Sequence, residues 1–187
     1  MRNFFRIGNG VDVGPILHAL AVQPELWNQN TLRTNHPDTP HKAVDDVWLR
    51  FQDVKPYLEG GDASAVVDEN ESIPYEAWSR LPQTHGIIFD LMRRVHGTRL
   101  GRVLITRLPP GKQIEPHEDG GAHAAYYRRY HVMLQNAPGS LFHCGDETVT
   151  MFPGEVWWFN NALTHSVVNN SADDRITMIV DIRIEPK

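Results

Sequence analysis

A histidine and an aspartate two positions apart, His117 and Asp119, are the first residues whose types and spacing could carry chemistry. On an extended chain, side chains alternate between two faces, so His117 and Asp119 point one way and Glu118 points the other. An imidazole and a carboxylate on one face can fill two adjacent positions around an octahedral metal ion. The spacing therefore favours a metal site, and a solvated turn without a metal is the alternative.

A third metal ligand would have to come from elsewhere in the chain, and His165 in the segment NNALTHSVVNN is the candidate. Two histidines and one carboxylate on one face of a metal ion leave three positions open. That arrangement is typical of non-haem Fe(II) oxygenases, whose open positions accept a chelating cosubstrate and O₂. A surface or packed histidine is the alternative for His165.

An arginine, Arg175, stands ten residues beyond His165 and begins the strongly β-patterned segment RITMIVDIRI. An arginine that enters a sandwich core needs an anion, and a carboxylate bound by both arms of its fork is the natural partner. The alternation of the segment does not decide whether Arg175 is buried. A surface ion pair with Asp173 or Asp174 therefore remains the alternative.

A second basic pair, Arg129 and His131, lies two positions apart on an expected strand. A basic pair inside an apolar sheet costs free energy unless an anion satisfies it, so the pair indicates a second part of an anionic site. The alternative is a partly exposed strand face, which is equally compatible with Arg128 and Tyr130 on the opposite side.

The chain from residue 97 onward consists of short segments rich in β-branched and aromatic residues, each bounded by Gly, Pro, Asn or Asp. Many short strands at this spacing are typical of an antiparallel sandwich or barrel. The expected strands are 99–108, 126–135, 140–144, 148–152, 155–160, 165–170 and 175–184.

The first 98 residues are expected to form a helical and loop cover with edge strands, so that residues 1–187 make one domain. Thr84 is expected to cap an amphipathic helix over 85–96, with apolar residues at helical spacing that face a core. The other expected elements are a helix over 15–22, a strand over 47–54 and loops over 30–42 and 59–74.

Composition narrows the classes of function. The 187 residues carry 18 Lys and Arg against 23 Asp and Glu, a formal net charge of −5, which disfavours non-specific binding to nucleic acid or to a membrane surface. One cysteine, Cys144, excludes a disulfide within the chain and a Cys-rich zinc site. No apolar run is long enough for a signal peptide or a membrane span, so we expect a cytoplasmic protein.

The order H-x-D, then H, then R resembles the 2-oxoglutarate/Fe(II)-dependent dioxygenases. More specifically, the chain resembles the aspartyl/asparaginyl β-hydroxylase family, which includes related bacterial amino-acid hydroxylases. The resemblance covers residues 100–185 well, whereas the first half matches in general style, best in WNQNTLR and VWLRF. The matching segments are PGKQIEPHED, RYH, CGDET and GEVWWFNNALTHSVVNNSADDR.

This resemblance implies a mainly β fold with flanking helices: a double-stranded β-helix, that is, a cupin-like jelly roll, with its core in 99–187. Some members of the family lack the carboxylate ligand, and Asp119 places this chain with the fuller pattern. The implied roles are iron ligation by His117, Asp119 and His165, binding of the 2-oxoglutarate C5 carboxylate by Arg175, further cosubstrate contacts by His131 and Thr106, and binding of an acidic substrate group by Arg129.

We therefore expect a dioxygenase that uses Fe(II), 2-oxoglutarate and O₂ to hydroxylate a C–H bond, with succinate and CO₂ as coproducts. The expected substrate is a free amino acid or an aspartyl or asparaginyl side chain in a peptide. One alternative is a cupin-type metal-dependent dioxygenase that does not use 2-oxoglutarate and has no need of Arg175. The other is a non-enzymatic jelly-roll binding protein.

The remaining histidines and aromatic residues are assigned lesser roles. The loop over 30–42, with Arg33, His36 and His41, is either a lid over the site or a plain surface loop. His123 is expected near the mouth of the site. Packing roles are expected for His143, Cys144, Trp157, Trp158 and Phe159.

Overall fold

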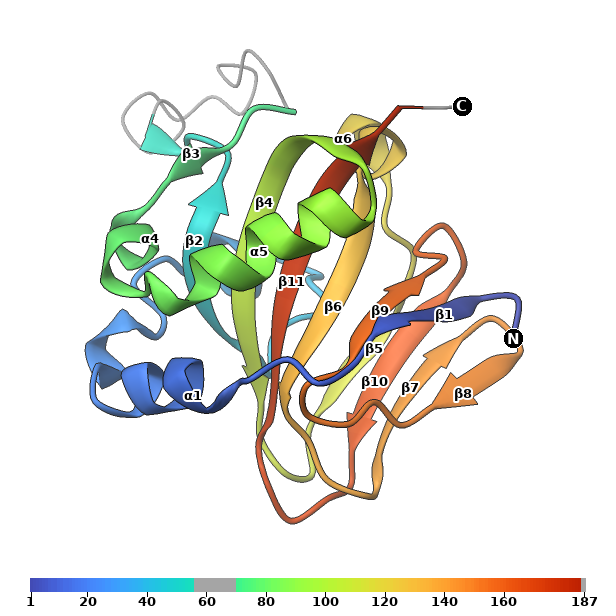
Figure 1. Ribbon diagram of the computed structural model, residues 1–187. Coiled ribbons are helices and arrows are strands. Elements are labelled where there is room, and N and C mark those ends of the chain that lie inside the picture. The colour runs from blue at the N-terminus through green and yellow to red at the C-terminus, as the bar shows by residue number, and fades with distance from the viewer. Residues whose placement is uncertain (56–69, 186–187) are drawn as a thin grey trace.

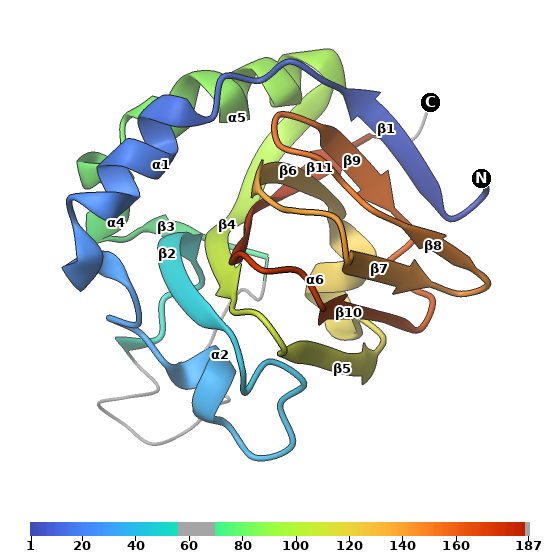
Figure 2. The same cartoon turned by 90° about the horizontal axis from the view of Figure 1, so that it is seen from below.

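Two antiparallel sheets face each other in the computed structural model of the chain, which describes residues 1–55 and 70–185 (Figures 1 and 2). The larger sheet has seven strands and the smaller has four. Strands that neighbour each other in a sheet are mostly far apart in sequence, as in a jelly roll. The jelly-roll expectation is therefore confirmed.

The seven-stranded sheet contains the longest strands, β4 and β11, at its centre. Their pairing brings Leu108 opposite Arg175 and Thr106 opposite Thr177. In sheet order its strands are β1 (Phe4–Gly8), β9 (Val156–Phe159), β6 (Arg128–Gln135), β11 (Arg175–Ile184), β4 (Gly97–Leu108), β2 (Asp45–Phe51) and β3 (Ile73–Pro74).

The four-stranded sheet lies across from the inner face of the larger sheet. Its central strand β10 pairs with β5 so that His165 stands opposite His117. In sheet order its strands are β5 (Gln113–His117), β10 (His165–Asn169), β7 (Ser140–Cys144) and β8 (Glu147–Val149).

Helices cover the outer face of the larger sheet, where α5 crosses β4, β11 and β6 (Figure 1). Ile88 and Leu91 of α5 pack there against Met178 and Val180 of β11 in the main apolar core. A second apolar cluster, which includes Met133 and Phe142, fills part of the space between the sheets. The helices are α1 (Gly14–Ala21), the 3₁₀ turn η1 (Pro24–Leu26), α2 (Leu32–Asn35), α4 (Glu76–Arg80), α5 (Gln83–Arg94) and α6 (Gly121–Tyr126).

The ends of α5 differ from the sequence prediction. The helix begins at Gln83, so Thr84 lies in its first turn and its hydroxyl donates to the Leu81 carbonyl at 2.7 Å instead of capping the helix. At the other end, His96 takes a left-handed φ of 55°, which ends the helix before the predicted boundary.

Other elements also differ from the prediction. The loop over 30–42 contains the short helix α2, and Tyr126 ends α6 where a strand was expected to begin. The N-terminal strand β1 was not predicted, because its residues show no alternating pattern bounded by turns. It forms by antiparallel pairing with β9. Most of the predicted loop over 59–74 lies outside the described residues. None of the described helices has the length and apolar run that crossing a membrane requires.

Candidate metal centre

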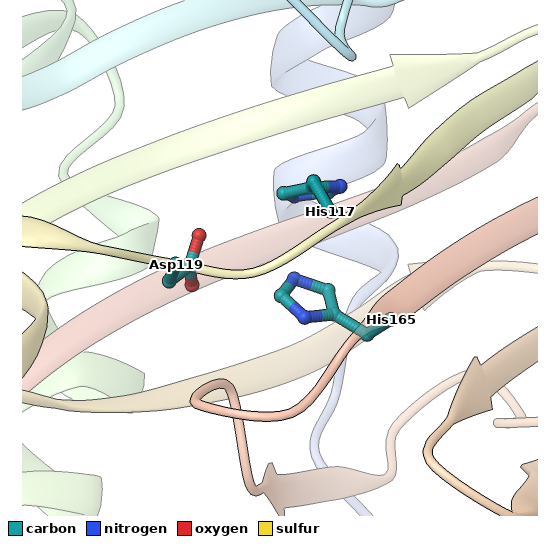
Figure 3. Close-up of side chains that lie close together, drawn as sticks. All are labelled: His117, Asp119 and His165. Carbon is teal, nitrogen blue, oxygen red and sulfur yellow. The ribbon is translucent and has the colours of Figure 1, made fainter.

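The side chains of His117, Asp119 and His165 lie close together (Figure 3). His117 ends β5 and His165 begins the neighbouring strand β10, while Asp119 lies just beyond β5. One ligand atom of each residue lies within 4.8 Å of the others. The three side chains therefore offer a single metal ion two imidazole nitrogens and one carboxylate oxygen.

The hydrogen bonds of both histidines fix which ring nitrogen is free. Nδ1 of His117 lies 2.7 Å from the Glu115 carbonyl, and Nδ1 of His165 lies 2.9 Å from the Leu163 carbonyl. A carbonyl can only accept a hydrogen bond, so both Nδ1 atoms carry the proton. Nε2 of each ring is then the nitrogen that can offer a lone pair to a metal ion.

The Asp119 carboxylate is held by one of its oxygens. Its Oδ2 accepts hydrogen bonds from Arg129 Nη1 at 2.7 Å and from Asn161 Nδ2 at 3.0 Å. Burial by itself would raise the pKa of Asp119, but the Arg129 charge and the Asn161 hydrogen bond outweigh it and lower the pKa. Asp119 is therefore ionised at neutral pH, with Oδ1 available to a metal ion.

Glu118 points away from this cluster, as strand alternation predicts. Its Oε1 accepts a hydrogen bond from the Thr164 hydroxyl at 2.7 Å. The Glu118 carboxylate is not part of the group of metal-ligating atoms found among the described residues.

A cavity of about 230 Å³ opens beside the three residues, and Arg175 lines it. Arg175 is 3% exposed, and its guanidinium makes no ion pair or hydrogen bond within the described parts of the chain. Its Nη2 is a buried donor without a partner, and burial lowers the pKa of Arg175 to about 10. The alternative of a surface ion pair with Asp173 or Asp174 is therefore wrong.

His131 and Thr106 line the same cavity. His131 is 6% exposed and its Nδ1 has no hydrogen-bond partner among residues 1–55 and 70–185. Burial, and next the charge of Arg175, lower the pKa of His131 well below its usual value, so the ring is neutral at pH 7. Thr106 brings a buried hydroxyl to the cavity from β4.

Arg129 is already neutralised by carboxylates of the protein itself. Its Nε and Nη2 donate to the two oxygens of Asp181, at 2.8 and 2.9 Å, while its Nη1 donates to Asp119. His123 Nε2 lies 2.9 Å from Asp181 Oδ2, so a buried chain runs from His123 through Asp181 and Arg129 to Asp119. The premise that Arg129 requires an anion from outside the protein is wrong.

This network predicts an acid-sensitive contribution to stability from Asp181. Burial would raise the pKa of Asp181, but its pairing with Arg129 outweighs burial and lowers the pKa far below the unfolded value near 3.9. A depressed folded pKa stabilises the protein above the unfolded pKa, and this stability is lost as the pH falls through the folded pKa.

We expect Asp181→Asn to lower the free energy of unfolding at pH 7 by about 3–5 kcal/mol, the usual cost of breaking a buried pair. Below pH 4 the difference in the free energy of unfolding between the variant and the wild type should become smaller. Urea unfolding of metal-free protein between pH 3 and pH 7 measures both. If this difference does not change with pH, the ionised carboxylate of Asp181 does not stabilise the fold.

Two residues of the loop over 30–42 reach the cavity. Arg33 and His41 line it, and the His41 ring meets the His117 ring edge-on with centroids 5.0 Å apart. Arg33 is fixed by a bidentate pair with the buried Asp46, at 2.9 Å for both hydrogen bonds. His36 is exposed and lies away from the cavity. The segment is therefore part of the cavity wall, and its closure as a lid stays a prediction.

Comparison with known proteins identifies the family of the chain. A sequence profile described as aspartyl/asparaginyl beta-hydroxylase matches residues 23–184, most of the chain. The chain belongs to the aspartyl/asparaginyl β-hydroxylase family. The family expected from the H-x-D, H and R pattern is thus confirmed, and the match also covers much of the first half.

Two individual proteins are similar to this member of the β-hydroxylase family. L-proline cis-3-hydroxylase 1 from a Streptomyces species is 38% identical over 60 residues, which are 32% of this chain and 20% of that protein. A structure from Burkholderia pseudomallei, titled an oxidoreductase of the 2OG-Fe(II) oxygenase family, aligns with a TM-score of 0.51 and 17% identity. That alignment covers 75% of this chain and 66% of the other, and it supports the shared fold.

Several residues around the candidate metal centre carry little local signal in the sequence. Asn161 and Asp181 hold Asp119 and Arg129, and Arg102 also lines the cavity. For Asp181 one clue existed, because it alternates with Arg175 on the same face of its strand.

The residues expected to have lesser roles are distributed as follows. His123 lines the cavity, but it is buried against Asp181, whereas it was expected near the mouth of the site. Cys144, Trp157 and Phe159 are buried in the apolar cluster between the sheets, and Phe159 also lines the cavity. His143 is only half-buried and bonds to the Thr148 hydroxyl.

Proposed function

We propose that this protein is an Fe(II)- and 2-oxoglutarate-dependent dioxygenase that hydroxylates a C–H bond. The donor set fits Fe(II), because two imidazoles whose Nδ1 atoms bond to carbonyls and one carboxylate match the facial triad of non-haem oxygenases. Family membership supports the same chemistry.

The observation that carries the proposal is the unpaired guanidinium of Arg175. A buried cation without a carboxylate is costly, and the donors on its planar fork match a carboxylate bound by two hydrogen bonds. The C5 carboxylate of 2-oxoglutarate satisfies that requirement inside the cavity that His117 and His165 also line. A cupin-type dioxygenase without 2-oxoglutarate gives Arg175 no role.

In this mechanism the side chains bind, orient and exclude water. Fe(II) and 2-oxoglutarate, when bound, supply the oxidising power for hydroxylation by O₂, with succinate and CO₂ as coproducts. His117, Asp119 and His165 would hold the metal ion, which leaves the cosubstrate and O₂ to complete its coordination. Arg175 orients the cosubstrate, and the neutral ring of His131 beside it adds a hydrogen-bonding nitrogen without a competing charge.

The aromatic lining keeps water out of this end of the cavity. The Phe142 and Phe159 rings pack around His131, with centroids 5.4 and 4.9 Å from the imidazole, and Phe159 also packs against His165. Exclusion of water strengthens every charged contact inside and protects reactive species from side reactions.

For the substrate we propose an amino acid, either free or as an aspartyl or asparaginyl residue of a peptide. The family name and the 60-residue similarity to an L-proline hydroxylase support this class. The cavity supports a small substrate group, because 230 Å³ lies below the roughly 300–1,000 Å³ typical of ligand pockets.

The test is succinate release from 2-oxoglutarate by protein loaded with Fe(II) in air, with candidate amino acids and peptides added in turn. We expect Fe(II)-dependent succinate formation that the substrate stimulates and a chelator abolishes. Stoichiometric Fe(II) binding with no 2-oxoglutarate turnover would refute the proposal and favour the cupin-type alternative.

A further inference from the structure

The arginines that line the cavity differ in whether the chain itself supplies a carboxylate partner. Four arginines line it: Arg33, Arg102, Arg129 and Arg175. Two of them have carboxylate partners within the chain, since Arg33 pairs with Asp46 and Arg129 pairs with Asp181 and Asp119. Arg102 and Arg175 have none among the described residues.

Arg102 is in direct contact with neutral side chains. Its Nη2 donates to the side-chain oxygen of Gln52, and its guanidinium lies over the Phe51 ring, 4.5 Å from the centroid. Its Nε is buried and has no hydrogen-bond partner within residues 1–55 and 70–185. Burial, and next the charge of Arg129, lower the pKa of Arg102 to about 10, so it remains a cation at neutral pH. The side chain is thus a positioned cation with unused donors that faces the cavity.

Arg102 and Arg175 are attached far apart along the direction of the strands. Arg175 of β11 lies opposite Leu108 of β4. Arg102 is also on β4, six residues before Leu108. At about 3.4 Å per residue, their attachment points are separated by roughly 20 Å along the strand. Leu104 and Thr106 line the cavity between them. One small dicarboxylate held by Arg175 therefore leaves Arg102 for a different anion.

We propose that Arg102 binds a carboxylate of the substrate, so that the substrate is a small carboxylic acid whose reacting carbon lies between this anchor and the metal centre. This inference rests on the proposed function, in which Arg175 is taken by 2-oxoglutarate. It also moves the acidic-group contact from Arg129, which the protein itself neutralises, to Arg102, which it does not.

The experiment measures binding and turnover separately. Protein loaded with Fe(II) and 2-oxoglutarate is titrated without O₂, by calorimetry, with the free L-amino acids, their C-terminal amides and end-capped peptides containing Asp or Asn. We expect binding by compounds with a free carboxylate and not by the matched amides. The capped peptides distinguish a side-chain carboxylate from a main-chain one.

Substitutions of Arg102 test whether this side chain makes the contact with the substrate carboxylate. Arg102→Gln should raise the Kd of the bound carboxylate tenfold to a hundredfold and leave the KM for 2-oxoglutarate unchanged, since charge-assisted hydrogen bonds are lost only at the substrate end. Arg102→Met keeps the packing on Phe51 and should weaken binding equally. Arg107→Gln is the matched control: Arg107 is on the same strand, pairs with Asp45 and lies outside the cavity lining, so Kd should not change.

Three outcomes would overturn the assignment: an unchanged Kd in both Arg102 variants, equal binding of a carboxylate and its amide, or no panel compound bound by wild type. Failure of the proposed function is a separate result. It would appear as no 2-oxoglutarate turnover in air by wild-type protein that still binds a carboxylate through Arg102.

Discussion

Asp119→Ala is expected to remove most Fe(II) binding and to abolish turnover. The substitution deletes the carboxylate ligand and also leaves the Arg129 fork with one of its two anionic partners missing. Loss of residues that merely orient metal ligands costs roughly 10–100-fold, so loss of the ligand itself should exceed that range. Equilibrium dialysis measures iron binding, and succinate release measures turnover.

Glu118→Ala is the matched control for Asp119. It removes the neighbouring carboxylate, which bonds to Thr164 on the other side of the chain. We expect wild-type iron affinity and turnover in this variant. An iron site that survives Asp119→Ala but is lost in Glu118→Ala would reverse the ligand assignment.

Arg175→Lys is expected to raise the KM for 2-oxoglutarate without changing Fe(II) affinity. Lysine keeps the positive charge but cannot present two parallel donors to a carboxylate. Loss of one charged hydrogen bond at a buried site costs about 1.5–3 kcal/mol, which is a tenfold to hundredfold effect. Initial rates of succinate formation against 2-oxoglutarate concentration measure the KM.

The corresponding control is Arg107→Lys, which changes a half-exposed arginine paired with Asp45 outside the cavity. Its KM for 2-oxoglutarate should match that of wild type. If Arg175→Lys also has the wild-type KM, the cosubstrate carboxylate binds to another residue.

The grouping of His117, Asp119 and His165 could be predicted from sequence because it depends on short-range rules. Strand alternation puts the first two on one face, and a β-rich context makes it reasonable for the third to lie on a neighbouring strand. The burial of Arg175 was not fixed by such a rule. It follows from the pairing of β11 with β4 and β6, which puts Arg175 on the inner face.

The pairing of Arg129 within the chain shows what alternation cannot supply. Arg129 and Asp181 are 52 residues apart and meet because β6 and β11 pair in the register that places them opposite each other. A shift of that register by one residue would turn Asp181 to the helix-covered face and leave Arg129 without this partner. Register across distant strands is set by the whole sheet, so the sequence of either strand alone does not reveal which arginine keeps a free charge.

The metal centre also joins the two layers of the sandwich. His117 and His165 belong to the four-stranded sheet, whereas Asp119 is tied through Arg129 and Asp181 to the seven-stranded sheet. An ion held by all three residues is a cross-link between the layers, made only in the folded chain. Ligands that bind only the native state raise its stability by RT ln(1 + [L]/Kd). If these residues hold iron, we expect the resistance of this protein to heat and to proteolysis to rise with the concentration of free Fe(II).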